Sequence, residues 1–187
     1  GKASENAILT DRVIDRPMRP LFPKDYRNDV TLENLVMSVE QDCSPELTAM
    51  LGASIATSIS DIPFDGPIST TQVGLVDGEF VFNPTAAQRE VSDLALTVAS
   101  TKEKVIMIEA GANEVPEDKM IEAIFAAHEL NQKVIAFFDT IVAECGKPKH
   151  EYQSFAVPQE LFDAIQKIVT PEEMEEAVFT DDKQTRE

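Results

Sequence analysis

The chain has no tryptophan, only two histidines and two cysteines, and no apolar run of the roughly 18 residues or more that a membrane span needs. Cys43 and Cys145 lie far apart and outside any CxxC or Cys/His cluster, so neither a structural zinc site nor a disulfide framework is expected. The N-terminus also lacks the apolar segment of a secretory signal peptide. These absences predict a reduced, cytoplasmic chain with no membrane partner.

Basic residues are also scarce, since 16 Lys and Arg stand against 34 Asp and Glu, a formal net charge of −18. A surface of this charge repels nucleic acid over long range. The charge is uneven, however: residues 1–27 contain six basic and four acidic residues, a net charge of +2, which leaves −20 for the rest of the chain. Any contact with nucleic acid is therefore expected within residues 1–27.

What is present is typical of a folded domain, with 43% hydrophobic and 27% charged residues. Ser4 is suited to cap a first helix, which Pro17 ends or kinks. Residues 30–39 (VTLENLVMSV) are rich in β-branched and apolar residues and predict a strand. The pair Asp77-Gly78 lies between two β-forming runs and predicts a β-hairpin.

The remaining pattern adds a helix after Ser44, a short helix at 86–91, strands at 94–100 and 105–110, and a long helix from Pro116. After a loop at 146–158, two helices are expected at 159–169 and 171–178. No strand pair has the crossover of a doubly wound sheet, so the predicted fold class is α+β. A boundary near residue 145 divides the chain into domains at 1–145 and 146–187, the second all-helical.

Three arginines of the first helix stand out. Arg12, Arg16 and Arg19 are spaced i, i+4 and i+7 and therefore share one helix face. Guanidinium groups in this arrangement could follow the phosphates of a nucleic acid. The alternative is a solvated surface on which Asp15 pairs with Arg19 or Arg12, each pair contributing about 0.3–0.5 kcal/mol. The spacing alone leaves both interpretations open.

Three groups of motifs run in order through residues 1–150. They are KASE at 2–5 with DRVIDRPMRPLFP at 11–23, then IPFDGPI at 62–68 with VG at 73–74 and FNPT at 82–85, then LTVAST at 96–101 with MIEAGA at 107–112, EDKM at 117–120 and HE at 128–129. Each motif alone is a weak match. In this order they make the chain resemble the first RNase PH-like repeat of the polynucleotide phosphorylase family.

The resemblance implies an RNase PH-like (ribosomal protein S5 domain 2-like) fold, incomplete at its N-terminus and followed by the start of a helical linker domain. It also implies a homotrimer whose six repeats form a ring around an RNA channel. Such an enzyme degrades RNA from the 3′ end with inorganic phosphate, releases nucleoside diphosphates reversibly, and serves mRNA catabolism. Arg16 and Arg19 match arginines that contact RNA at the channel entry, with Arg12 as a third candidate. Further arginines are expected in a Phe-Phe-Arg-Arg loop before the first residue.

The same resemblance implies that catalysis is not encoded in this chain. In the family's active repeat, a Gly-Asp-x-Asp-x-Lys pattern and an earlier Asp supply carboxylates that hold a divalent ion, Mg²⁺, at the reacting phosphate. Here Asp93 remains, but Ala95 and Thr97 stand at the second acid and the lysine, and Ala87 at an earlier carboxylate. We therefore expect no catalytic or metal-binding residue, with Asp93 only a strand-start residue and Mg²⁺ bound by a repeat absent from this chain.

Other candidates favour structural roles. His128 lies on the apolar face of the long helix with no second ligand four residues away, and His150 lies in a loop. Two rival functions stay open. One is a non-catalytic ring subunit, similar to exosome proteins that keep the fold to bind RNA and neighbouring subunits. The other is an acidic protein-binding domain, which would leave Arg16 and Arg19 with nothing to contact.

Overall fold

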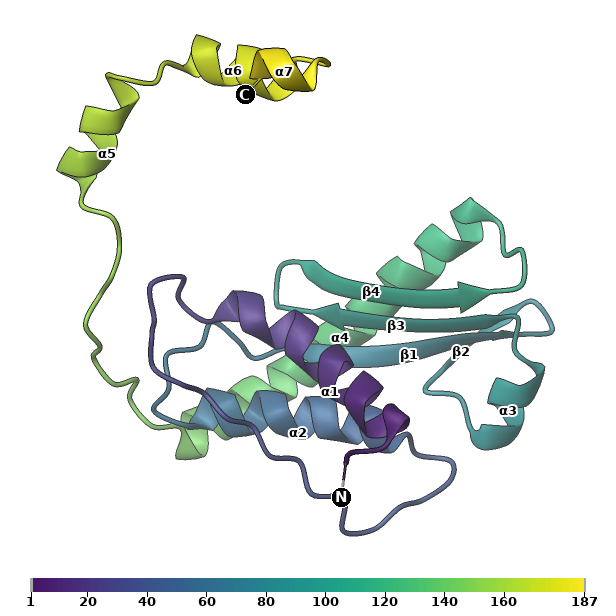
Figure 1. Cartoon of the computed structure of the whole chain (residues 1–187). Helices are drawn as coiled ribbons and strands as arrows, with labels where there is room; N and C mark the ends of the chain where they lie inside the picture. The colour runs from purple at the N-terminus through teal and green to yellow at the C-terminus, as the bar shows by residue number, and fades with distance from the viewer. Residues whose placement is uncertain (1, 187) are drawn as a thin grey trace. The chain divides into compact units, whose positions relative to one another are not determined.

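A computed structural model describes residues 2–186 (Figure 1), so the terminal residues of the two expected domains, 1 and 187, lie outside the described residues. Contacts within the chain divide it into two compact units. The first contains residues 2–24 and 28–152, and the second contains residues 25–27 and 153–186. The first unit holds the sheet and the helices packed on it.

The sheet of the first unit has four antiparallel strands in the order β2-β1-β3-β4. Their bounds are β1 Ser69–Val76, β2 Glu79–Phe82, β3 Leu94–Ser100 and β4 Val105–Ala112. The predicted hairpin is confirmed: Asp77 and Gly78 join β1 to β2 with φ values of 51° and 82°. Two consecutive residues with positive φ match the right-handed twist of paired strands.

The helices of the first unit are α1 Glu5–Met18, α2 Pro45–Ile59, α3 Ala86–Val91 and α4 Glu117–Cys145, with a 3₁₀ turn η1 at Arg19–Leu21. Because side chains alternate along a strand, the two faces of the sheet bury different residues. On one face, Ala99 and Met107 pack in a core cluster with residues of α1 and α2. On the other face, Leu96 and Val98 pack against α4. The predicted α+β class is confirmed.

The strand predicted at residues 30–39 is wrong. The segment has no regular secondary structure. Leu32 packs against the core cluster of α1 and α2, but Leu35, Val36, Met37 and Val39 are exposed, Met37 by 89%. A β-forming composition becomes a strand only when a neighbouring strand supplies hydrogen bonds and packing. No such neighbour pairs with it among the described residues, and it lies beside α2, with which it lines a groove of about 590 Å³.

The chain after α4 is helical, as expected. Its helices are α5 Gln159–Gln166, α6 Pro171–Phe179 and α7 Lys183–Arg186. α5 ends three residues before the predicted position 169, whereas α6 begins at the predicted Pro171, after a capping box formed by Thr170 and Glu173. Residues 147–150 belong to the first unit and bond to the end of α2 and the residues after it, through Lys147 N–H to Ile59 O at 2.9 Å and His150 N–H to Asp61 O at 2.7 Å. A domain boundary at residue 145 stays a prediction.

Candidate nucleic-acid interface

Helix α1 carries Arg12 and Arg16, and Arg19 follows directly as its C-cap residue, so the packing of α1 decides which way the three candidate arginines face. The Ser4 hydroxyl caps the helix by accepting the Ala7 N–H at 3.1 Å. Ile14 and Met18 are buried against α2 and the sheet. Since Arg12, Arg16 and Arg19 lie on another stripe of the helix, their side chains remain exposed. The helix therefore presents the basic stripe expected from the sequence.

Arg19 is held by Asp15, which lies one turn earlier, in the last turn of α1. Its Nε and Nη2 donate to the two carboxylate oxygens of Asp15 at 2.9 and 2.7 Å. This pairing uses one edge of the planar guanidinium and leaves three of its five N–H groups unused by Asp15. The Arg19 side chain is 76% exposed, so those groups face solvent. The sequence allowed Asp15 to pair with Arg19 or Arg12, and in the structure it pairs with Arg19.

Arg16 is held by a residue that the sequence analysis did not single out as a partner. Its Nη1 donates to the Oε2 atom of Glu109, on β4, at 2.6 Å. Both side chains are about half exposed, so solvent screens the pair and its contribution to stability is small, about 0–1 kcal/mol. What the pair does is fix the end of α1 over β4. Arg12, in contrast, makes no ion pair within residues 2–186.

Beyond α1, the same face of the sheet opens into a pocket of about 390 Å³. Ala95 and Thr97 of β3 line it, together with Glu109 and the side chain of Arg89. Arg89 is committed to structure, because its Nη1 and Nη2 donate to the carbonyl oxygens of Pro84 and Gln41 at 2.6 and 2.9 Å. The two positions that match an acid and a lysine of an active repeat thus present a methyl group and a hydroxyl group.

These residues do not fit a magnesium ion. Mg²⁺ needs carboxylates that are open to it, and the one carboxylate lining the pocket, that of Glu109, already binds Arg16. Asp93 lies just before β3, where its backbone pairs with Leu75 and Asn113 at 2.9 Å each. Within residues 2–186, no three His, Cys, Asp or Glu side chains lie close enough together to hold a metal.

A buried polar cluster joins α4 to the sheet, and the sequence analysis missed it. Asn131 is fully buried and its Nδ2 donates to Val98 O at 3.0 Å and to Ser100 Oγ at 3.1 Å. Its Oδ1 accepts from the Thr71 hydroxyl at 2.8 Å. A buried amide that satisfies three partners fixes the register of a helix on a sheet more strictly than apolar contacts do. No motif signals it, because the partners are distant in sequence.

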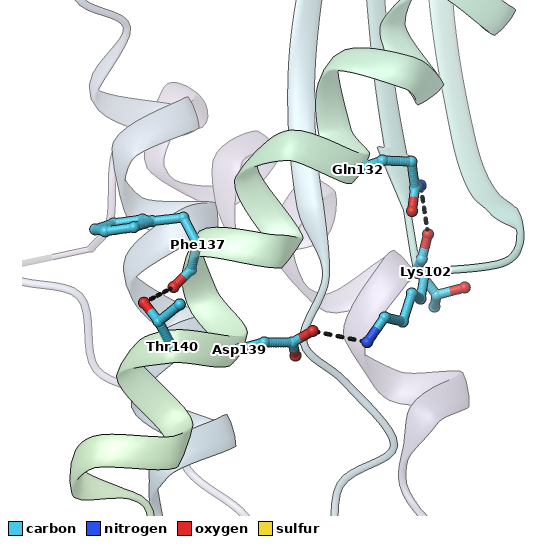
Figure 2. A network of polar contacts seen from close by, with 6 residues as sticks. Lys102, Gln132, Phe137, Asp139 and Thr140 are labelled. Atoms are coloured by element: carbon cyan, nitrogen blue, oxygen red, sulfur yellow. Dashed lines mark hydrogen bonds and ion pairs between the residues drawn. The ribbon is translucent and has the colours of Figure 1, made fainter.

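Next to this cluster, a partly buried contact and an exposed one tie α4 to the turn between β3 and β4 (Figure 2). Gln132 Nε2 donates to the carbonyl oxygen of Thr101 at 3.0 Å, and Lys102 Nζ forms an ion pair with Asp139 at 2.7 Å. The Gln132 amide also lies 3.3 Å from Nδ1 of His128, which is half-buried. These contacts agree with a structural histidine at this position.

Lys149 closes the C-terminal end of α2. Its ammonium donates to the carbonyl oxygens of Thr57, Ser58 and Ser60 at 3.2, 2.9 and 2.8 Å. The last carbonyls of a helix have no partner within the helix, and a lysine there satisfies them and complements the helix dipole. Burial lowers the pKa of Lys149, while the nearby carboxylate of Asp61 acts in the opposite direction.

The fold and its sequence match a known class. Residues 66–129 match the 3′ exoribonuclease family, domain 2. The crystal structure of rice (Oryza sativa) Rrp46 superposes with a TM-score of 0.60, covering 76% of this chain and 68% of Rrp46, at 12% sequence identity. At that identity the likeness concerns the fold alone. The first unit therefore has an RNase PH-like fold, as predicted.

Proteins with high sequence identity to this chain define its class more closely. Over all 187 residues the chain is 80% identical to the polyribonucleotide nucleotidyltransferase of Lachnoclostridium phytofermentans and 56% identical to that of Ruminiclostridium cellulolyticum. It is 51% identical over 186 residues to that of Clostridioides difficile. The chain spans 26–27% of the length of these relatives. The resemblance predicted from the motifs is thus confirmed: the chain is similar throughout to a segment of polyribonucleotide nucleotidyltransferases.

Among residues 2–186, no helix combines the length and the apolar character that crossing a membrane would require.

Proposed function

We propose that the protein containing this chain is a phosphate-dependent 3′-to-5′ exoribonuclease, which converts RNA and inorganic phosphate reversibly to nucleoside diphosphates. The observation that carries the proposal is the 80% identity to a polyribonucleotide nucleotidyltransferase over every residue of the chain. The proposal includes a cytoplasmic homotrimer that acts in mRNA catabolism, in which the six RNase PH-like repeats surround an RNA channel.

Within that protein, this chain is proposed to be the first repeat, a catalytically silent ring scaffold that also forms part of the RNA entry. The side chains lining the open sheet face support the silent role, since Ala95 and Thr97 offer no carboxylate to Mg²⁺ and Glu109 is engaged by Arg16. The Mg²⁺ and phosphate needed for phosphorolysis are then bound by a repeat outside this chain. There the ion offsets charge on the reacting phosphoryl group.

The proposed RNA contact is the arginine stripe of α1. Arg16 and Arg19 each keep N–H groups that their carboxylate partners do not use, and a guanidinium suits phosphate because its planar fork matches two phosphate oxygens. Arg12 lies on the same stripe and is the third candidate. Phosphate contacts carry no base information, so the stripe would follow RNA without reading its sequence.

Two measurements on the full-length protein test the proposal. With poly(A), Mg²⁺ and phosphate, it should release nucleoside diphosphates, and omission of phosphate should stop the release. RNA affinity at fixed salt should fall in R16A/R19A. The matched control is K102A/K119A. It also removes two ion-paired cations, but their carboxylate partners, Asp139 and Glu122, lie on α4.

Equal affinity of R16A/R19A and the control variant would refute the RNA-entry role. A full-length protein that binds RNA but releases no nucleoside diphosphates would refute the enzymatic role and favour the non-catalytic ring subunit.

A further inference from the structure

We propose that Asp15 is a positioning residue for RNA binding, which holds the Arg19 guanidinium with one edge open to a phosphate group. The inference rests on the proposed role of Arg19 in contacting RNA. It assigns to an acidic residue, within the most basic part of the chain, a favourable effect on the binding of a polyanion. Simple charge repulsion would give that residue the opposite effect.

The geometry of the pair carries the argument. Asp15 takes the Nε and Nη2 hydrogens on one side of the guanidinium, at 2.9 and 2.7 Å. The end formed by Nη1 and the second Nη2 hydrogen stays available, and that end is itself a fork suited to two phosphate oxygens. A phosphate group can therefore bind Arg19 without displacing Asp15. Two bonds also fix the plane of the guanidinium, which one bond would not do.

The location of Arg19 makes such positioning useful. Its side chain is 76% exposed, so core packing does little to restrict it. An arginine held only by its own backbone loses a large rotamer entropy when it binds a ligand. Asp15 lies in the last turn of α1, and the backbone N–H of Arg19 bonds to the Asp15 carbonyl oxygen. Asp15 in the last turn and Arg19 at the C-cap are thus both anchored to the end of α1, and the ordering occurs before RNA arrives.

Arg16 provides a contrast on the same helix. Its single bond to Glu109 uses Nη1, one of the two nitrogens at the end of the fork. A phosphate group approaching the end of Arg16 meets a nitrogen already shared with a carboxylate. Arg16 keeps an open fork at its Nε and Nη2 edge, but one bond does not fix the plane of its guanidinium. The two bonds of Asp15 fix the plane of Arg19, and this is why the positioning role is assigned to Asp15 and not to Glu109.

The test is a double-mutant cycle on the full-length protein, with RNA affinity measured at about 0.15 M salt, where long-range charge effects are screened beyond about 8 Å. We expect D15N to weaken RNA binding about threefold to tenfold when Arg19 is present, a loss of about 0.7–1.4 kcal/mol. In the R19A background, D15N should have no effect. D15E keeps the charge and can reach the same edge, so it should restore most of the affinity.

The outcomes separate the inference from the proposed function. RNA affinity in D15N equal to or tighter than that of the unmodified protein would overturn the positioning role, since Asp15 would then act only as a repelling charge. The same factor in both backgrounds would overturn it as well, because Asp15 would not act through Arg19. If R16A and R19A, singly and together, bind RNA as well as the unmodified protein, the proposed RNA-entry role itself fails.

Discussion

Replacing Asn131 by alanine should destabilise the first unit strongly, because the amide is the shared partner of two strands. The substitution takes the acceptor from the Thr71 hydroxyl and one donor from each of Ser100 Oγ and Val98 O. All of these groups lie in a region where Asn131, Thr71 and Ser100 are at most 1% exposed, so water does not replace the lost partner easily. The side chain that is removed also leaves a void between α4 and the sheet.

The magnitude follows from these losses. Each buried polar group left without a partner costs about 1–3 kcal/mol. With two hydroxyl groups affected and a small cavity added, we expect the free energy of unfolding to fall by about 3–5 kcal/mol. Because domains are stable by only about 5–15 kcal/mol, this loss would be a large part of the total.

Amide hydrogen exchange on β1, β3 and α4 is the suitable assay, since the two units can open separately and a single global transition would mix them. N113A is the control: Asn113 is exposed and its amide donates to Asp93 at 3.4 Å, so its loss should stay within about 0.5 kcal/mol. In N131L/T71V/S100A, apolar groups replace the whole cluster, and most of the stability should return. A loss below about 1 kcal/mol in N131A would refute the reasoning.

Three other predictions follow from the same structure. K149A should lower the free energy of unfolding by about 1 kcal/mol, because three carbonyl oxygens at the end of α2 lose their donor at a site that is only partly buried. Urea titration of K149A against K147A measures the difference. G78A should cost about 1–2 kcal/mol, since its φ of 82° is strained for alanine, and a G52A variant, whose added methyl group meets open space in a helix, should not be destabilised. The 187-residue chain alone, given poly(A), phosphate and Mg²⁺, should release no nucleoside diphosphates in a chromatographic assay, and any release above background contradicts the silent role.

Structural features that depend on residues close together in the sequence could be predicted. The hairpin at Asp77-Gly78 depends on two residues that adopt positive φ, and the start of α1 depends on the Ser4 hydroxyl three residues before Ala7. The Asp15–Arg19 pair was among the predicted alternatives because a spacing of four residues places two side chains together on a helix. In each case, the interacting residues are at most four positions apart, so the pattern can be recognised in the sequence.

Features that depend on contacts between distant segments could not be predicted. Glu109 lies 93 residues from Arg16, and Asn131 lies 60 residues from Thr71, so neither pair leaves a local pattern. The error at residues 30–39 has the same origin, because a strand depends on a partner that local composition does not specify. The arginine stripe could be located from charge and spacing, but the carboxylates that orient it required the fold.

The central claim is that Arg16 and Arg19 contact RNA phosphates, and the salt dependence of RNA binding tests it most directly. For single-stranded RNA, each phosphate contact adds about 0.7 to the slope of log affinity against log salt. The full-length R16A/R19A variant should therefore show a slope smaller by about 1.4, with the same change for RNAs of different sequence. K102A/K119A should keep the slope of the unmodified protein. An unchanged slope in R16A/R19A would show that these arginines form only a solvated, ion-paired helix surface.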